Sequence, residues 1–145
     1  MKALLQRVSQ SSVTVDGELI SSTRSGLLIL LGIEKEDTSE KAEALAKKIA
    51  HLRIFDDEQG KMNLSVMDVG GEVLVISQFT LMANTKKGNR PSFIDAAPPA
   101  IAKPLIRDFC QGMQTYGLEV SEGVFGAHMM VSLINDGPVT IWLEN

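Results

Sequence analysis

Hydrophobic residues in the first part of the chain recur in the short runs that are typical of β-strands. Partial alternation of Leu, Val and Thr predicts strands over residues 2–8 and 11–15. Asp16-Gly17 is a two-residue hairpin signal, after which residues 18–23 return antiparallel. The apolar run over residues 26–33 is too short for a helix, so we interpret it as a strand that is covered on both faces.

Two later segments show the three- and four-residue spacing of amphipathic helices. Asp37 and Glu40 resemble a capping box at the start of the first helix. That helix has about four turns, and its apolar positions are Ala42, Leu45, Ile49 and Leu52. The second helix is predicted over residues 99–116, with Gly117 as its stop. We expect Pro104 to kink its first turns.

The remaining pattern completes a mixed α and β chain. Residues 55–61 read as a turn, and residues 71–81 are the most strongly β-patterned segment, which predicts a central strand. Three closing strands are predicted over residues 118–124, 128–134 and 138–143. This order lacks a regular βαβ alternation, so it predicts an α+β fold in which a curved, mostly antiparallel sheet or β-barrel is covered by two helices. At 145 residues we expect residues 1–145 to form one domain.

Composition limits where the protein works and what it binds. The longest apolar run, residues 27–31, is far too short to span a bilayer, and the first residues lack the apolar core of a secretory leader. A lone Cys110 cannot form an internal disulfide, and only His51 and His128 accompany it, so no zinc or iron cluster is expected. A cytoplasmic protein without a bound metal fits these features.

Charge argues mildly against nucleic acid as a partner, with one local exception. The chain has 14 Lys and Arg against 18 Asp and Glu, a net charge of −4. Lys86, Lys87 and Arg90 nevertheless fall within five positions, and no acidic residue follows them until Asp95. The cluster is interpreted either as a solvated loop or as a local basic patch.

Familiar catalytic motifs are missing from the chain. Neither histidine belongs to a nucleophile motif such as G-x-S-x-G, and each reads as an ordinary half-exposed histidine. No glycine-rich phosphate loop is present, which argues against nucleotide hydrolysis and dinucleotide redox chemistry. An enzyme with this sequence therefore needs a reaction that makes few demands on catalytic side chains.

Two segments remain unusual on physical grounds. Ser77-Gln78-Phe79-Thr80 ends an otherwise apolar strand, and alternation places Ser77 and Phe79 on one face and Gln78 and Thr80 on the other. Such polar groups are either hydrogen-bonded within the sheet or line a cavity or interface. Asn135 to Thr140 reads as a tight turn between two strands, and its Gly137-Pro138 bond is of the type that is sometimes cis.

Five motifs together resemble the bacterial and eukaryotic D-aminoacyl-tRNA deacylase family. They are QRV at 6–8, GKMNLSV at 60–66, SQFTL at 77–81, KGNRPSF at 87–93 and NDGPVT at 135–140. The resemblance runs from residue 1 to residue 144 in the family's order and spacing, so it is far more specific than any one motif.

The resemblance implies a homodimer with two active sites at the subunit junction. Ser77, Gln78, Phe79 and Thr80 of one chain would line the pocket, and Gly137-Pro138, held cis, would reach in from the other chain. The family hydrolyses the ester between a D-amino acid and the terminal adenosine of tRNA, and it also removes glycine. It needs no metal or organic cofactor.

Physical reasoning extends these implied roles. An aminoacyl ester is already activated. In one mechanism the backbone N–H groups of Phe79 and Thr80, together with the substrate's own ribose hydroxyl, are sufficient to catalyse its hydrolysis. In the alternative mechanism the Thr80 hydroxyl acts as a nucleophile. Arg7 is expected to brace the carbonyls of Gly137-Pro138, or else it is a surface arginine on an edge strand.

Charged tRNA is the expected partner, and two other functions stay open. Lys86, Lys87 and Arg90 are expected to contact the phosphates of the acceptor stem. The alternatives are a related deacylase that corrects a mischarged L-amino acid and a non-catalytic RNA-binding dimer.

Overall fold

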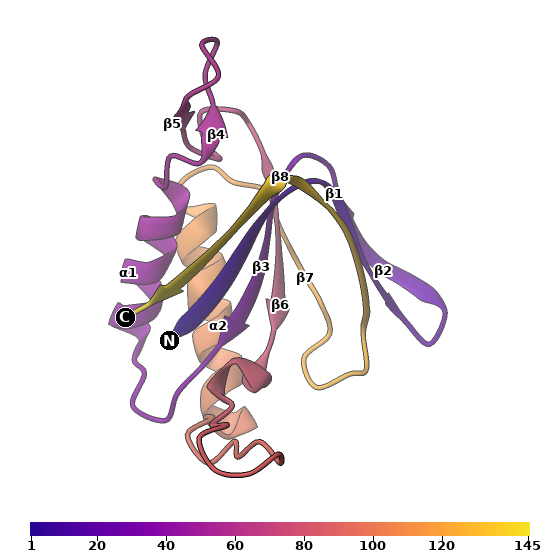
Figure 1. The fold of residues 1–145 in the computed structure, drawn as a ribbon, viewed down its shortest axis with the longest axis vertical. Helices are drawn as coiled ribbons and strands as arrows, with labels where there is room; N and C mark the ends of the chain where they lie inside the picture. Colours follow the sequence, from indigo (N-terminus) through magenta and orange to yellow (C-terminus); the bar gives the residue numbers. More distant parts are fainter.

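The computed structural model describes residues 1–145 and contains a six-stranded sheet with two helices packed on one side of it (Figure 1). The strands are β1 (Lys2–Val15), β2 (Glu18–Thr23), β3 (Gly26–Gly32), β4 (Phe55–Asp56), β5 (Met62–Leu64), β6 (Glu72–Ser77), β7 (Val120–Glu122) and β8 (Met130–Glu144). The helices are α1 (Ser39–Ala50), the short 3-10 helix η1 (Phe79–Met82) and α2 (Pro99–Gln114). The predicted α+β class is confirmed. None of the helices is long and apolar enough to cross a membrane.

The long strand β1 organises the sheet. Along one edge, its first half (Lys2–Val8) pairs with β3 and its second half (Ser11–Val15) pairs with β2, while its other edge pairs with β8. These three pairings are antiparallel, whereas β3 with β6 and β6 with β7 pair in parallel. The sheet is therefore mixed in direction, and it is curved (Figure 1); β2, β7 and β8 each pair with one strand only. A separate hairpin, β4–β5, projects at one end of the molecule (Figure 1).

Apolar residues cover both faces of the central strand β3. Leu27, Ile29 and Leu31 belong to the larger hydrophobic cluster, which also contains the inner faces of α1 and α2. Leu28 points the other way and joins a smaller cluster with Leu74 of β6, against which residues of β8 pack. Burying one such leucine contributes about 1.5–3 kcal/mol. The prediction of a strand covered on both faces is confirmed.

Helix α1 begins one residue later than the capping box predicted. The N-cap is Thr38, whose hydroxyl accepts a hydrogen bond from the Lys41 N–H at 3.4 Å. Asp37 is instead buried, and its carboxylate accepts from the amino group of Met1 and from the Glu34 N–H, both at 2.7 Å. The capping prediction was wrong because Asp37 ties the loop before α1 to the start of β1. Pro104 lies inside α2 without ending it.

The strand boundaries differ from the sequence predictions in several places. The break predicted between residues 8 and 11 does not exist, because β1 runs without interruption from Lys2 to Val15 and Gln10 pairs with Ile134 of β8. The predicted turn over residues 55–61 begins with the short strand β4 and is followed by β5. Strand β7 covers only Val120–Glu122 of the predicted 118–124. The strand predicted over residues 71–81 ends at Ser77, where the chain turns into η1.

The predicted turn at Asn135 to Pro138 is a bulge within β8 and not a connection between two strands. Thr140 pairs with Gln6 of β1, and Asn135 pairs with Val8. Only one residue of β1 lies between these partners, while four residues of β8, 136–139, lie between theirs. The extra residues leave the ladder without interrupting it, because β8 pairs with the same neighbour on both sides of the bulge.

Close packing at Gly26 lets β3 and β6 begin side by side. Gly26 has φ +158°, and a Cβ atom there would lie 1.8 Å from the carbonyl oxygen of Glu72, its partner on β6. No side chain fits at that distance. The parallel pairing of the two strands therefore depends on a glycine at this position.

We expect Gly26→Ala to lower the free energy of unfolding by about 3 kcal/mol or more, because backbone strain adds to a clash with rigid backbone. Gly17→Ala is the matched control: Gly17 also has positive φ, but a Cβ atom there meets nothing within 4 Å. The control should cost only about 1–2 kcal/mol. Urea unfolding of both variants measures the difference, and equal losses would contradict the packing argument.

Candidate functional site

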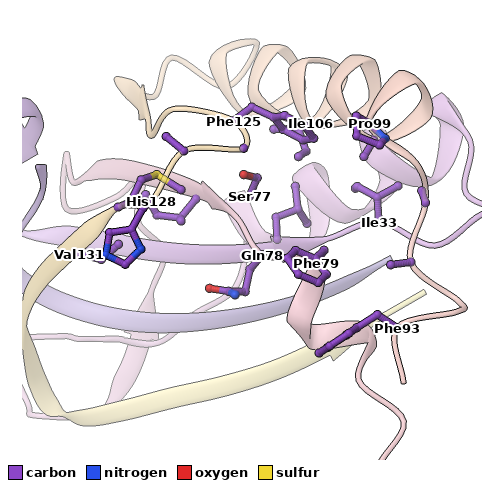
Figure 2. Close-up of a pocket in the computed structure, with 18 residues that line it drawn as sticks. Ile33, Ser77, Gln78, Phe79, Phe93, Pro99, Ile106, Phe125, His128 and Val131 are labelled. Atoms are coloured by element: carbon purple, nitrogen blue, oxygen red, sulfur yellow. The ribbon is translucent and has the colours of Figure 1, made fainter. Parts of the chain in front are cut away.

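A cavity of about 550 Å³ opens where β6 ends and η1 begins (Figure 2). Its walls come from β3, the β6–η1 junction, the loop before α2, the first turns of α2, and the segment between β7 and β8. Most of the lining is apolar and includes Leu31, Ile33, Ile76, Phe79, Phe93, Ala102, Ile106, Phe125 and Met129. The volume falls in the range of sites for small molecules.

Three of the four residues predicted in the Ser77–Thr80 segment line this cavity. They are Ser77, Gln78 and Phe79, and Figure 2 shows Gln78 and Phe79 across the cavity from Ile106 of α2. Thr80 is exposed beside them, and its hydroxyl accepts a hydrogen bond from the Gln78 amide. The segment thus belongs to a cavity and is not merely a strand end.

The strand alternation predicted for this segment was wrong, because the chain leaves the sheet there. The Gln78 N–H donates to the Leu31 carbonyl at 2.8 Å, and η1 starts at the next residue. At Gly32 the turn comes so close that a Cβ atom would lie 2.9 Å from the Gln78 carbonyl and 2.7 Å from Met82. The N–H groups of Phe79 and Thr80 lie at the start of the 3-10 helix. The i to i+3 hydrogen bonds of this helix therefore provide no carbonyl acceptor for them.

The loop after η1 carries the predicted basic cluster and is anchored at its base. Asn84 and Ser92 exchange two backbone hydrogen bonds of 2.8 and 3.0 Å, which close the loop. Lys86, Lys87 and Arg90 lie between these two residues and are all exposed. The loop begins at the end of η1 and returns to the cavity wall directly after Ser92, so the three cations are carried next to the cavity.

Aromatic contact ties this loop to η1. The ring of Phe93 lies 5.1 Å from the ring of Phe79 at an interplanar angle of 72°, an edge-to-face arrangement. Both rings line the cavity. Sequence reasoning assigned no role to Phe93 beyond its place in a motif.

Sequence reasoning also missed the wall formed by residues 125–131. This segment includes His128, the one titratable side chain among the lining residues. The sequence pattern predicts a strand that starts at His128, but β8 begins at Met130, and the residues before it form a loop over the cavity. Small and apolar residues in this stretch give no signal that separates a cavity wall from core. No three His, Cys, Asp or Glu side chains are grouped so that they could hold a metal ion.

Arg7 holds the bulge in β8 and is not a surface residue. Its side chain is buried, and β1 is an interior strand, so the alternative of a surface arginine on an edge strand is wrong. Its Nε donates to the Asp136 carbonyl at 3.0 Å, and its Nη1 donates to the Ile54 carbonyl at 2.8 Å. The carboxylates of Asp56 and Asp136 lie 3.4 and 3.6 Å away. The bond predicted to the carbonyls of Gly137-Pro138 is therefore made to the preceding residue.

Asn135 holds the bulge from the other side. Its Oδ1 accepts from the Val139 N–H at 2.8 Å, and its Nδ2 donates to the Val139 carbonyl at 3.1 Å. Gly137 and Pro138, joined by a cis peptide bond, lie exposed between these anchors. Neither residue has a partner on β1, and neither carbonyl accepts a hydrogen bond from a side chain. The bulge thus presents two carbonyl groups on a well-anchored segment.

The cavity and the bulge lie at different ends of the sheet within one chain. Arg7 pairs with Leu27 at the start of β3, whereas Ser77 pairs with Leu31 near the end of that strand. Four residues of strand separate these levels by about 13 Å, and the two features also lie on different strands. The structure therefore brings Ser77, Gln78, Phe79 and Thr80 together, but it does not bring Gly137 and Pro138 to them.

Comparison of the sequence with a family model and with related proteins gives the same kind of match over nearly the whole chain. The family model described as D-Tyr-tRNA(Tyr) deacylase matches residues 4–144. A protein named D-aminoacyl-tRNA deacylase from Thermomicrobium roseum is 59% identical over 145 residues, covering 100% of this chain and 94% of the relative. A protein of the same name from Deinococcus deserti is 60% identical over 144 residues, covering 99% of each.

Two solved structures share the fold over nearly the full length. One, described as a c-Myc DNA Unwinding Element Binding Protein, has a TM-score of 0.93 and 46% identity and covers 100% of this chain and 99% of its own. The other, described as a probable eukaryotic D-amino acid tRNA deacylase, has a TM-score of 0.84, covers 98% of this chain and 97% of its own, and at 16% identity supports the fold alone. Given the family match over residues 4–144 and relatives near 60% identity, the chain belongs to the D-Tyr-tRNA(Tyr) deacylase family.

Proposed function

We propose that this protein hydrolyses the ester bond between a D-amino acid and the terminal adenosine of tRNA, releasing free D-amino acid and tRNA, and that it also removes glycine. The observation that carries the proposal is the Ser77–Thr80 segment at a cavity of about 550 Å³, in a chain 60% identical to a D-aminoacyl-tRNA deacylase. A cavity of this size accommodates an aminoacylated ribose or its base.

The cavity favours a mechanism in which the substrate assists its own hydrolysis. Its lining contains no carboxylate and no lysine, and His128 is its one titratable side chain. An aminoacyl ester is activated, and its neighbouring ribose hydroxyl can orient a water or share developing charge. In this proposal the N–H groups of Phe79 and Thr80 stabilise the oxyanion, while Ser77 and Gln78 position the ester. The reaction requires no metal or organic cofactor.

A second copy of the chain completes the proposed site. Within one chain the anchored carbonyls of Gly137 and Pro138 lie far from the cavity, so in this proposal they reach the cavity of a partner in a homodimer. Strand β8 supports such pairing, because β1 is its only strand partner and it exposes large apolar side chains along its length. These are Met130, Ile134 and Trp142.

The preference for D-amino acids follows from the position at which the substrate's α-amino group binds. In this proposal the carbonyls of Gly137 and Pro138 accept hydrogen bonds from that group, which fixes the Cα atom. The hydrogen and the side chain of the two enantiomers then exchange places, so an L side chain meets the backbone of the bulge. Glycine has no side chain to exclude and passes. A ten-thousandfold preference requires a wall that costs the L substrate about 5.5 kcal/mol.

The remaining roles concern tRNA and the cell compartment. In this proposal Lys86, Lys87 and Arg90 contact the phosphates of the acceptor stem, because their loop adjoins the cavity. None of the three forms an ion pair with a carboxylate of the chain. We place the protein in the cytoplasm, where charged tRNA is used. Burial raises the pKa of the Cys110 thiol well above its usual range, so the single cysteine stays protonated there.

The proposed function predicts that the purified protein releases D-tyrosine from D-tyrosyl-tRNA and spares L-tyrosyl-tRNA. The expected ratio of kcat/KM is at least about a thousandfold, equivalent to about 4 kcal/mol of exclusion. Release of free amino acid from the two charged tRNAs measures it. Comparable rates on both enantiomers would point to the related deacylase for L-amino acids, and binding without release would point to a non-catalytic RNA-binding dimer.

Thr80→Ala separates the two catalytic routes. Alanine keeps the backbone N–H and removes the hydroxyl, so the substrate-assisted route predicts a fall in kcat of less than about tenfold. A covalent route through the Thr80 hydroxyl predicts a loss of about a thousandfold or more. Single-turnover hydrolysis of D-tyrosyl-tRNA measures the change, and an acyl ester trapped on Thr80 would end the substrate-assisted proposal.

Loosening the bulge should weaken chiral discrimination. Lysine at position 7 cannot bond two carbonyls through a planar fork, so Arg7→Lys is expected to lower the D-to-L ratio of kcat/KM by about tenfold and the free energy of unfolding by about 2 kcal/mol. Asn135→Ser removes the opposite anchor and should lower the ratio as well. If both variants lose stability but keep the ratio, the bulge has no part in rejecting L substrates.

A further inference from the structure

A second group of basic side chains surrounds a hollow of about 480 Å³ at the carboxyl end of α1. Its lining consists of Ala44, Lys47, Lys48, His51, Leu52 and Arg53. Four of these six residues carry basic side chains, and none is acidic. We refer to this feature as the α1 hollow.

The cations of the α1 hollow are free of carboxylate partners. None of Lys47, Lys48 and Arg53 takes part in the ion pairs of the chain, and all three are exposed. The chain as a whole has a net charge of −4. Unpaired cations around one concave site in an acidic protein favour an anionic ligand over internal stabilisation.

The hollow has a fixed floor. The Nδ1 atom of His51 lies 2.8 Å from the Lys47 carbonyl, and its ring meets the ring of Tyr116 edge-on at 5.0 Å. Leu52 packs against the main hydrophobic cluster. The backbone that carries Lys47 and Arg53 is therefore held in place, while their long side chains remain free to reach a ligand.

Arg7 places the α1 hollow next to the bulge in β8. Its guanidinium group donates both to the Ile54 carbonyl and to the Asp136 carbonyl. Arg53 directly precedes Ile54, and Gly137 directly follows Asp136. Consecutive Cα atoms are about 3.8 Å apart, so Arg53 of the hollow and Gly137 of the bulge are each one residue away from backbone that the same guanidinium group holds.

We propose that the α1 hollow binds backbone phosphates of the same tRNA whose aminoacyl end lies in the partner subunit's cavity. This inference rests on the proposed function. If the bulge of one subunit reaches the cavity of the other, it brings the α1 hollow close to the part of the tRNA chain that emerges from that cavity. Each tRNA is then held by two basic surfaces from different subunits, the loop with Lys86 and Lys87 on one and the α1 hollow on the other. Such contacts are independent of sequence and sensitive to salt.

The test compares two double variants that change charge equally. Lys47→Gln with Arg53→Gln removes two cations from the hollow, and Lys103→Gln with Arg107→Gln removes two exposed cations from α2. For each, kcat/KM on D-tyrosyl-tRNA is measured over a range of salt concentrations, and kcat/KM on D-tyrosyl-adenosine is measured in parallel. We expect the negative slope of log(kcat/KM) against log[salt] to become shallower by about 2 in the hollow variant and to stay unchanged in the α2 variant.

D-tyrosyl-adenosine lacks the tRNA backbone, so it distinguishes failure of the phosphate-binding proposal from failure of the proposed deacylase function. Equal turnover of D-tyrosyl-adenosine by all variants, with a salt slope reduced only in the hollow variant, supports phosphate binding. An unchanged slope, or equal reductions in both variants, overturns it while leaving the deacylase intact. A lowered melting temperature with an unchanged slope also overturns it, since it assigns Lys47 to the helix dipole alone. Absence of turnover on both substrates in the unmodified protein defeats the proposed function itself.

Discussion

Strand β1 uses the hydrogen-bonding groups of both its edges, and the curvature of the sheet depends on this. One edge serves β3 and then β2, while the other edge runs along β8. Fourteen residues of one strand thus join elements from both ends of the chain. Both faces of β3 are buried, because the helices pack on one side of it and the first half of β8 packs on the other. The cavity forms at the edge of this arrangement, where β6 stops and η1 turns back over Gly32.

Arg7, which also lies on β1, joins remote segments of the chain at the other end of the molecule. A buried guanidinium group is costly unless its donors are satisfied, and here two carbonyls and two carboxylates surround it. These partners come from β8 and from the segment around β4, which are remote from each other in sequence. One side chain therefore fixes the bulge and the end of the α1 region together. The features proposed to act on substrate from the second subunit share this single support.

Local pattern predicted most of the fold but little of the site's geometry. The apolar period around Leu45 located α1, and Asp16-Gly17 located the first hairpin. The segment after Ser77 was misjudged because its departure from the sheet depends on contact with Gly32, which is remote in sequence. Likewise the local pattern around Asp37 predicts a helix cap, because the burial of its carboxylate against Met1 depends on tertiary contact. Motifs named Ser77 and Gln78, while Phe93 and His128 carry no local signature of a cavity wall.

A carbonyl within a regular ladder is directed at the neighbouring strand, so a well-formed sheet has few acceptors left for another molecule. The irregularity at residues 136–139 is an exception of limited extent, because the ladder resumes on either side of it. Its first and last carbonyls accept hydrogen bonds from Arg7 and Asn135, which leaves the middle two without a side-chain donor. Rigidity and availability are thus combined within four residues. A flexible surface loop offers acceptors as well, but it cannot hold them at a constant spacing.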